Sequence, residues 1–422
     1  MTTQPHADRA ALLALRARVL SPTYRLFYEQ PLHLVRAADV WMYDEQGRAY
    51  LDAYNNVPVV GHCHPYVVDA LTRQARTLNT HTRYLAEQPL ELAEELLATM
   101  PGELGNVIFT CTGSESNDLA VRIAKAVTGG SGFIITDFSY HGVTDVLAGM
   151  SPEDGGPLGP GVYAVPSPAA AGGAAAFGEH VGECIERMRT DGVRLAALLV
   201  DTIFSSDGVY ADPRGFLADA VRHVQAAGGL FIADEVQPGF GRLGESMWGF
   251  QRHGVVPDIV TMGKPMGNGH PVAAVAARPE VLERFAKRRH YFNTYGGNSV
   301  SCAAALAVLQ VIRREALLEN AQRTGEYLKE GLKALAGRTP AIGEVRGAGL
   351  FLGVELRVNP VSGLSGAAET RRVVNGMCRR GVLVGSTGRH GDVLKIRAPL
   401  TLGRSQAQLL LETLEQTLSS QD

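Results

Sequence analysis

The sequence predicts an α/β protein with a large domain, built on a mainly parallel central sheet, and a smaller α/β domain. Between residues 107 and 276, short apolar runs alternate with helical stretches, which is typical of a parallel sheet covered on both faces. A fresh set of strands and a final helix follow a long helical pattern over 300–335. The 422 residues also exceed what one hydrophobic core usually serves, which is about 250–300 residues.

The expected elements can be placed in order along the chain. A short amphipathic helix starts it, a hairpin over 32–54 turns at Asp44-Glu45-Gln46-Gly47, and a helix covers 89–100. Residues 151–182, rich in Gly, Pro and Ala, are predicted to form a surface excursion. The expected strands are 107–110, 132–136, 195–201, 229–234, 258–262, 272–276, 342–356, 382–384 and 393–396. The domain boundaries that follow are 1–58 (N-terminal segment, joining the small domain), 59–305 (large domain) and 306–422 (small domain).

Composition narrows the class of protein. Forty Lys and Arg against 43 Asp and Glu give a net charge of −3, which argues against a nucleic-acid-binding surface. The 5 cysteines are dispersed, as expected for reduced thiols in a cytoplasmic protein. No apolar stretch approaches the roughly 20 residues that cross a bilayer, and the first residues do not resemble a secretory signal. In His62-Cys63-His64, adjacent ligands have poor geometry for one metal ion, so no metal site is expected.

One lysine stands apart from the few others in the chain. Lys264 directly follows an apolar run predicted to be a buried strand, and glycines and methionines surround it. A lysine desolvated at a strand end has a lowered pKa and can form a Schiff base. The alternative is an ordinary surface lysine on a turn.

A carboxylate occupies a similar place thirty residues earlier. Asp234 ends another predicted buried strand, and in open α/β sheets ligands lie beyond the carboxyl ends of the strands. A carboxylate there can hold a positive charge, such as a protonated pyridine nitrogen. Alternatively, Asp234 caps a helix or forms an ion pair with Arg242.

Two further segments offer groups for a ligand. Gly113 and Ser114 lie where a strand passes into a helix, so backbone N–H groups and a hydroxyl could bind a phosphate there, although Ser also caps helices without any ligand. Tyr140 follows another strand and offers a ring for stacking, or else packs in the core. A phosphate cradle, a stacking ring, a carboxylate and a lysine are the four groups that pyridoxal 5′-phosphate needs. We therefore predict this cofactor.

Several segments in the same order are also familiar: Gly61-His-Cys-His-Pro, Thr112-Gly-Ser-Glu-Ser-Asn-Asp, Tyr140-His-Gly, Asp234-Glu-Val-Gln-Pro-Gly-Phe-Gly-Arg, Pro257-Asp-Ile-Val-Thr-Met-Gly-Lys and Phe292-Asn-Thr-Tyr-Gly-Gly-Asn. With them, the chain resembles the class III aminotransferases of the fold type I pyridoxal-phosphate enzymes over nearly its whole length. The resemblance implies that Lys264 carries the Schiff base and that Asp234 pairs with the pyridine nitrogen. It also implies that Gln237 reaches the phenolic oxygen, while Val236 and Tyr140 pack on the two faces of the ring.

The resemblance further implies a shared phosphate site. Gly113 and Ser114 would hold the cofactor phosphate, joined by Thr294 of the partner subunit. The active protein would then be a homodimer.

One branch of the family looks more similar than the transaminases. Met42-Tyr-Asp-Glu-Gln-Gly, Val60-Gly-His-Cys-His-Pro, Leu78-Asn-Thr-His-Thr-Arg-Tyr-Leu, Gly267-Asn-Gly-His-Pro-Val and Tyr291-Phe-Asn-Thr-Tyr-Gly-Gly are similar to the ethanolamine-phosphate phospho-lyases. Those enzymes convert phosphoethanolamine to acetaldehyde, ammonia and phosphate, and the branch includes a phosphohydroxylysine lyase. The resemblance therefore implies a small phosphorylated amine as substrate.

The substrate side of the site supports the same branch. Several class III transaminases keep a Glu that neutralises the substrate arginine, and here Ser206 stands at the Glu position and Arg397 at the arginine position. Without that Glu, Arg397 stays free to hold an anion throughout turnover. Asn55 matches a family substrate-pocket position, and His141 and Arg83 are candidates by location, with a structural role equally open.

Two other functions remain open from the sequence. An ω-amino-acid or amine transaminase using pyruvate or 2-oxoglutarate would share every cofactor residue. A non-catalytic, cofactor-binding regulator would keep the fold, but the intact set of cofactor residues argues against it.

Overall fold

The structure is a computed structural model that describes residues 8–168, 174–360 and 362–420. Its strands are β1 (Leu34–Ala38), β2 (Trp41–Asp44), β3 (Ala49–Asp52), β4 (Asn106–Thr110), β5 (Gly132–Thr136), β6 (Val162–Val165), β7 (Leu195–Asp201), β8 (Leu230–Asp234), β9 (Ile259–Met262), β10 (Ala273–Ala277), β11 (Ile342–Ala348), β12 (Phe351–Leu356), β13 (Val382–Leu383), β14 (Gly385–Thr387) and β15 (Val393–Ile396). The α-helices are α1 (Arg9–Val19), α2 (Pro65–Thr77), α3 (Glu87–Leu97), α4 (Gly113–Thr128), α5 (Asp145–Ala148), α6 (Ala174–Thr190), α7 (Leu217–Ala226), α8 (Pro279–Ala286), α9 (Ser299–Arg314), α10 (Leu317–Ala336), α11 (Gly366–Arg379) and α12 (Arg404–Ser419). Short 3₁₀ turns are η1 (Pro152–Asp154), η2 (Gly249–His253) and η3 (Lys264–Gly267).

The central sheet has seven strands in the order β4-β10-β9-β8-β7-β5-β6. Strands β6, β5, β7, β8 and β9 are parallel, and only β10 pairs antiparallel with its two neighbours, β4 and β9. The predicted α/β fold with a mainly parallel sheet is therefore confirmed. Because the strands are parallel, the carboxyl ends of β7, β8 and β9 lie at one edge of the sheet.

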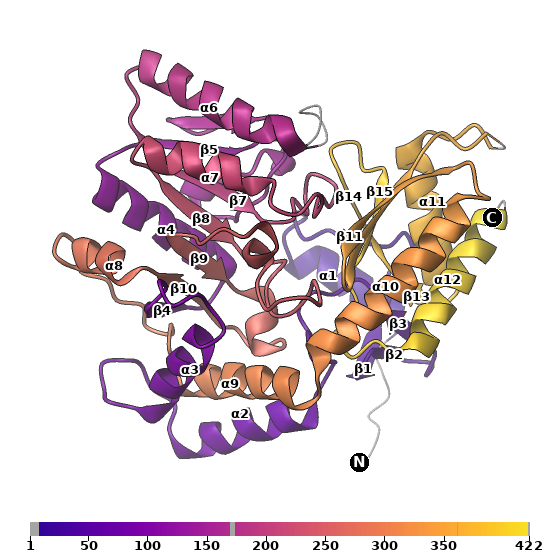
Figure 1. Ribbon diagram of the computed structural model, residues 1–422. Coiled ribbons are helices and arrows are strands. Elements are labelled where there is room, and N and C mark those ends of the chain that lie inside the picture. Colours follow the sequence, from indigo (N-terminus) through magenta and orange to yellow (C-terminus); the bar gives the residue numbers. More distant parts are fainter. Residues whose placement is uncertain (1–7, 169–173, 361, 421–422) are drawn as a thin grey trace.

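Helices cover both faces of this sheet, as its apolar strands require (Figure 1). Alternate strand residues belong to two different buried clusters, because successive side chains point to opposite faces. Ile134, Leu198 and Phe231 pack with residues of α6 and α7, whereas Phe133 and Ile232 pack with residues of α4 and α8. Helix α4 thus lies along one face, with its first turn at the carboxyl edge of the sheet.

Two smaller sheets complete the chain. One is antiparallel, in the order β11-β12-β15-β14; α10 and α11 pack against it, and α12 packs on these two helices (Figure 1). In the other, β1-β2-β3-β13, the C-terminal strand β13 runs parallel to β3. The N-terminal strands therefore lie with the C-terminal part of the chain. The boundaries at 58/59 and 305/306 stay predictions, and the second falls within α9.

The expected surface excursion over 151–182 was wrong, whereas the helical pattern over 300–335 is confirmed but divided. Residues 151–182 contain β6, an edge strand of the central sheet that pairs with β5, and the beginning of α6; residues 169–173 lie outside the described ranges. The helical pattern over 300–335 is two helices, α9 and α10, which are separated where Ala316 adopts a left-handed backbone conformation (φ 50°).

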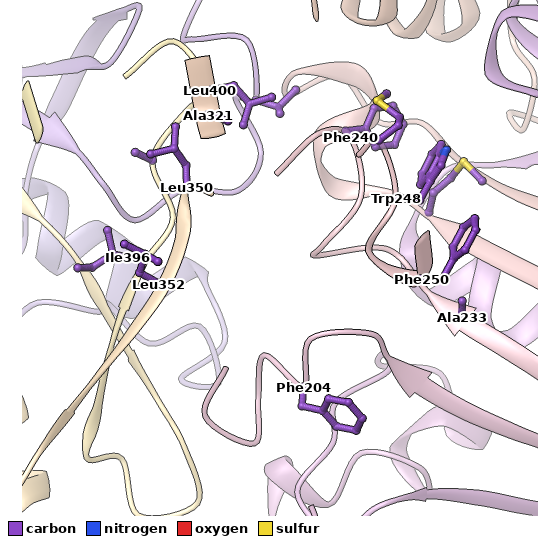
Figure 2. Packing of buried hydrophobic residues seen from close by; sticks show 14 of the residues in the cluster. Phe204, Ala233, Phe240, Trp248, Phe250, Ala321, Leu350, Leu352, Ile396 and Leu400 are labelled. Carbon is purple, nitrogen blue, oxygen red and sulfur yellow. The ribbon is translucent and has the colours of Figure 1, made fainter. Parts of the chain in front are cut away.

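A continuous buried cluster joins the central sheet to the antiparallel sheet (Figure 2). Leu352 and Ile396 lie on the small sheet, while Phe240, Trp248 and Phe250 lie toward the central sheet. Each such side chain contributes about 1.5–3 kcal/mol when it is fully buried. The end of β15 is thereby held near the carboxyl edge of the central sheet, where the candidate site lies.

Candidate active site

The candidate site begins with polar residues at three neighbouring strand ends. Asp201 and Asp234 end β7 and β8 and pair in register, while Lys264 follows β9 after Gly263. These residues line a cavity of about 100 Å³. Its other lining residues are Gly113, Ser114, Asn117, Tyr140, His141, Gly142, Val236 and Gln237.

The Lys264 side chain stands inside this cavity rather than on a surface turn. No described residue forms a hydrogen bond or an ion pair with its amine, although the side chain is accessible from the cavity. Surrounding protein atoms lower the pKa of Lys264 by desolvation, Asp234 acts in the opposite direction, and Arg397 lowers the pKa further. A lysine in this setting is suited to nucleophilic and base chemistry.

Three donors fix the Asp234 carboxylate. Asn117 Nδ2 donates to Oδ2 at 2.8 Å, the Val236 backbone N–H donates to Oδ1 at 3.1 Å, and His141 Nδ1 lies 2.7 Å from Oδ2. Asp234 therefore has no ion pair with Arg242, which instead donates to the Ala398 carbonyl oxygen. These contacts hold the carboxylate in one orientation at the cavity wall. A carboxylate that pairs with a protonated pyridine nitrogen needs such a fixed orientation.

The N-terminus of α4 lies beside Lys264 at the cavity. Thr112 caps α4 by accepting from the Glu115 N–H at 3.1 Å, so Ser114 is not the cap. The Ser114 hydroxyl lines the cavity, where the positive end of the helix dipole favours a phosphate. A Cβ added at Gly263 would lie 3.0 Å from the Gly113 nitrogen, so the absence of a side chain there lets β9 approach α4 closely.

Gly113 packs directly against Val236, and a larger residue there should weaken phosphate binding. In Gly113→Ala, the new methyl would lie 2.9 and 3.0 Å from the two Val236 methyl carbons, which forces the first turn of α4 to shift. We expect the affinity for the cofactor to fall roughly tenfold. Equilibrium titration of apoenzyme measures this loss, and Val236→Ala in the same chain should recover part of it. Unchanged cofactor affinity in Gly113→Ala alone would contradict a phosphate site at Gly113 and Ser114.

A chain of hydrogen bonds connects Asp201 with Arg397. Ser205 donates its hydroxyl to Asp201, Gln237 Nε2 donates to Ser205 Oγ at 2.5 Å, and Arg397 Nη1 donates to Gln237 Oε1 at 2.5 Å. Burial raises the pKa of Asp201, and the Ser205 hydrogen bond lowers it in part. Gln237 thus lies between the cofactor-side residues and the arginine expected to bind substrate.

The surroundings of Arg397 lack the glutamate that neutralises this arginine in several transaminases, because Ser206 stands at that position. Ser206 donates to Glu153 Oε2 at 2.7 Å, so this hydroxyl holds a carboxylate that comes from η1. Arg397 forms no ion pair with a carboxylate of any described residue. The rings of Tyr54 and Phe351 lie 5.7 and 5.6 Å from its guanidinium carbon.

Of the remaining predicted site residues, His141 lines the cavity, whereas Asn55, Arg83 and Thr294 lie outside it in this single chain. His141 contacts Asp234 through Nδ1, which is the structural role that the sequence left open, and its role toward a substrate phosphate stays a prediction. Asn55 Nδ2 donates to Asp52 Oδ2 at 3.0 Å, outside the residues that line the cavity. Arg83 is exposed and lies 3.9 Å above the Phe292 ring. Thr294 is exposed in a separate surface hollow.

Sequence reasoning missed three residues of the site. Asn117, Asp201 and Ser205 all touch the cavity or its hydrogen-bonded wall. Asn117 lies one helical turn after Gly113, so the i, i+4 spacing would have placed it on the same face. Asp201 ends a predicted parallel strand, as Asp234 does, and the same rule about strand ends applies to it.

The two histidines of His62-Cys63-His64 have separate partners. His62 Nε2 lies 2.7 Å from Asp52 Oδ2, and His64 Nε2 lies 3.0 Å from Glu315 Oε1. Within the described ranges, no three His, Cys, Asp or Glu side chains are grouped as a metal site. In the same ranges, no helix combines the length and the apolar character needed to cross a membrane.

Comparison with known proteins identifies the family. The family model for "Aminotransferase class-III" matches residues 27–418. The chain belongs to the class III aminotransferase family. Members of this family use pyridoxal 5′-phosphate, and the free lysine, the oriented carboxylate and the α4 N-terminus fit that cofactor. Pyridoxal 5′-phosphate is therefore the cofactor of this enzyme.

Individual relatives include both transaminases and lyases. An "Alanine--glyoxylate aminotransferase 2-like" protein of Drosophila melanogaster is 38% identical, over 96% of this chain and 86% of its own length. An "Ethanolamine-phosphate phospho-lyase homolog 1" of Caenorhabditis elegans is 33% identical, over 99% and 95%. A solved phospholyase from Arthrobacter, in complex with phosphoethanolamine, is 43% identical with a TM-score of 0.93, and the match covers 97% of this chain and 100% of that one.

Proposed function

We propose that this class III enzyme is a phospho-lyase that eliminates phosphate from O-phosphoethanolamine to give acetaldehyde, ammonia and phosphate. The observation that carries the proposal is Arg397, a cation beside the cavity that no described carboxylate neutralises. A transaminase pocket alternates between substrates with and without a negative end, whereas a lyase substrate carries its phosphate throughout turnover. A permanently available arginine suits the second case.

Different residues of the chain would then perform the separate steps of the reaction. When bound, pyridoxal 5′-phosphate supplies an electron sink for the pair left at the carbon next to the substrate nitrogen. Lys264 would take the proton from that carbon, because its amine stands free in the cavity and its pKa is lowered. Asp234, oriented by Asn117 and His141, would keep a proton on the pyridine nitrogen.

Loss of phosphate completes the elimination. The bond between the second carbon and the phosphate oxygen breaks, and Arg397 would neutralise part of the charge on the departing group. Water then hydrolyses the remaining two-carbon fragment to acetaldehyde and ammonia. In total, one phosphoethanolamine and one water give one acetaldehyde, one ammonia and one phosphate.

The decisive experiment measures inorganic phosphate released from O-phosphoethanolamine by purified holoenzyme, without a keto acid. Steady release over many turnovers is the expected result. If phosphate is not released, but amino groups are transferred once pyruvate or 2-oxoglutarate is added, the enzyme is a transaminase and the proposal fails. O-phosphohydroxylysine, tested in parallel, distinguishes between the two phosphorylated amines.

The second candidate function is an ω-amino-acid or amine transaminase. The 38% identity to an alanine–glyoxylate aminotransferase 2-like protein favours it. All residues on the cofactor side serve both reactions, so only the substrate side separates them. The lyase proposal has the stronger support because Ser206 stands at the position of the glutamate found in several transaminases, and its hydroxyl donates to Glu153.

We also propose that the active enzyme is a homodimer with Thr294 reaching the cavity of the partner subunit. Thr294 adjoins an exposed apolar patch that contains Tyr84, Leu85, Phe292 and Tyr295, and Leu85 and Tyr295 are 95% and 71% exposed. Large exposed apolar groups side by side are typical of protein interfaces. His81 connects the two segments, with its ring 5.1 Å from that of Tyr84 and 5.9 Å from that of Phe292.

A subunit-mixing experiment tests the shared site. We expect Thr294→Ala to lower activity roughly tenfold by removing one donor to a phosphate. Lys264→Ala subunits supply an intact Thr294 to their partners, so a mixture of the two variants should form dimers with one complete site. Activity regained on mixing supports a site shared between subunits. If the mixture shows no gain although mixed dimers form, Thr294 does not act across the interface.

A further inference from the structure

A second buried cation precedes Arg397 on the same strand. Lys395 lies on β15 and is only 7% exposed. It stands two residues before Arg397, and alternate residues of an extended strand point to the same face. The two side chains therefore leave the small sheet on the side that faces the central sheet and Lys264.

The strands on either side leave space for the Lys395 side chain. Its register partners are Gly353 on β12 and Gly385 on β14, neither of which has a side chain. A Cβ at Gly385 would lie 2.9 Å from the Tyr54 ring, and a Cβ at Gly353 would lie 3.0 Å from Val209 Cβ. Lys395 thus projects between Tyr54 and the segment that follows β7, which also holds Ser205 and Ser206.

No described residue accepts a hydrogen bond from the Lys395 amine or forms an ion pair with it. The charged groups that face it are Arg397, Glu153, Asp201 and Lys264. The two carboxylates have other partners, since Glu153 accepts from Ser206, and Asp201 accepts from Ser205. A buried ammonium beside a guanidinium is unfavourable unless an anion joins them.

We propose that Lys395 and Arg397 together form the binding site for the substrate phosphate, a dianion, with Lys395 as the residue that selects phosphate over a singly charged end. This inference rests on the proposed lyase function and extends it to a residue that the sequence did not identify as part of the site. One cation is sufficient for a carboxylate, whereas a phosphate dianion is balanced by two. Lys395 also lies on the side of Lys264, so it can stabilise the phosphate as the carbon–oxygen bond breaks.

The test compares Lys395→Met and Lys395→Arg with the wild-type holoenzyme. The matched control is Lys333→Met, which changes an exposed lysine on α10. Binding of inorganic phosphate and of ethyl phosphate, neither of which reacts, is measured by calorimetry with the cofactor site filled. We expect Lys395→Met to weaken both roughly 10- to 100-fold, as for loss of one charge-assisted hydrogen bond. Lys395→Arg should restore most of the affinity, and the Lys333 control should not differ from wild type.

The pH dependence provides a readout that a purely structural lysine would not change. Burial, and then the neighbouring Arg397, lower the pKa of Lys395 to about 7. The ligand itself gains its second negative charge between about pH 6 and about pH 8, so the readout is the ratio of phosphate affinities in wild type and Lys395→Met. This ratio should decline over that range because the wild-type amine loses its proton. This decline should be weaker in Lys395→Arg, whose guanidinium stays charged.

The outcomes separate the two claims. If wild type releases no phosphate from O-phosphoethanolamine, the proposed function fails, and the Lys395 inference is still decided by the binding data. Equal phosphate affinity in wild type and Lys395→Met would overturn the inference, even if lyase activity is present. Loss in Lys395→Met with no recovery in Lys395→Arg, at unchanged melting temperature and cofactor absorbance, would also count against a charge-based role.

Discussion

Lys264→Ala should reduce turnover by at least about 10³-fold, because one side chain supplies both the attachment point of the cofactor and the base. In the structure the amine lies in the cavity with no described partner, within the electrostatic influence of Asp234. The nearby Lys395 cannot replace it, since that side chain belongs to β15 and projects between Tyr54 and the segment after β7. Steady-state kinetics and the visible absorbance of the lysine-bound cofactor measure the effect, and both should be lost together.

Lys333→Ala is the matched control for this variant. Lys333 is exposed on α10, so its removal should leave both readouts unchanged. Appreciable turnover in Lys264→Ala, at a cofactor content equal to that of wild type, would show that another amine carries the chemistry. The assignment of Lys264 would then be wrong.

The cofactor side of the site was largely predictable because it depends on local sequence. Asp234 and Lys264 each follow a short apolar run, and such runs identify buried parallel strands without any tertiary information. Gly113 lies at a strand-to-helix junction, where the local pattern also locates the helix N-terminus. Since parallel strands end at one edge, three local patterns were sufficient to bring these residues together.

The partners of these residues were not predictable in the same way. His141 and Asp234 are 93 positions apart in the chain, and their contact depends on how the loop after β5 folds over the sheet. The segment between them contains an edge strand, β6, whose half-exposed residues follow a run of Gly and Pro that hides the strand pattern. The substrate side likewise depends on how β15 packs against the loop after β7, which no local pattern specifies.

Asp234→Asn should retain part of the cofactor yet lose activity by about 10²- to 10⁴-fold, because a neutral amide does not keep a proton on the pyridine nitrogen. The native carboxylate accepts from Asn117 and from Val236 and lies 2.7 Å from His141. An asparagine has one oxygen to offer these donors, so its NH₂ group would face another donor and the side chain would lose its fixed orientation. The loss of negative charge and the loss of orientation both weaken the hold on the pyridine proton. This explains why an isosteric change should lower turnover so strongly.

The measurement for Asp234→Asn pairs the turnover number with the cofactor content of the purified protein. Asp219→Asn is the control, since Asp219 is exposed on α7 and forms an ion pair with Arg222, also exposed. A fall in cofactor content alone, with normal turnover for each bound cofactor, would show that Asp234 serves affinity rather than chemistry. Loss of turnover with retained cofactor is the expected result, because the geometry fixes this carboxylate against the cavity and gives it donors that only an anion satisfies fully. Removing one of those donors should also lower turnover. Because the carboxylate itself remains, Asn117→Ala should show a smaller loss of turnover than Asp234→Asn.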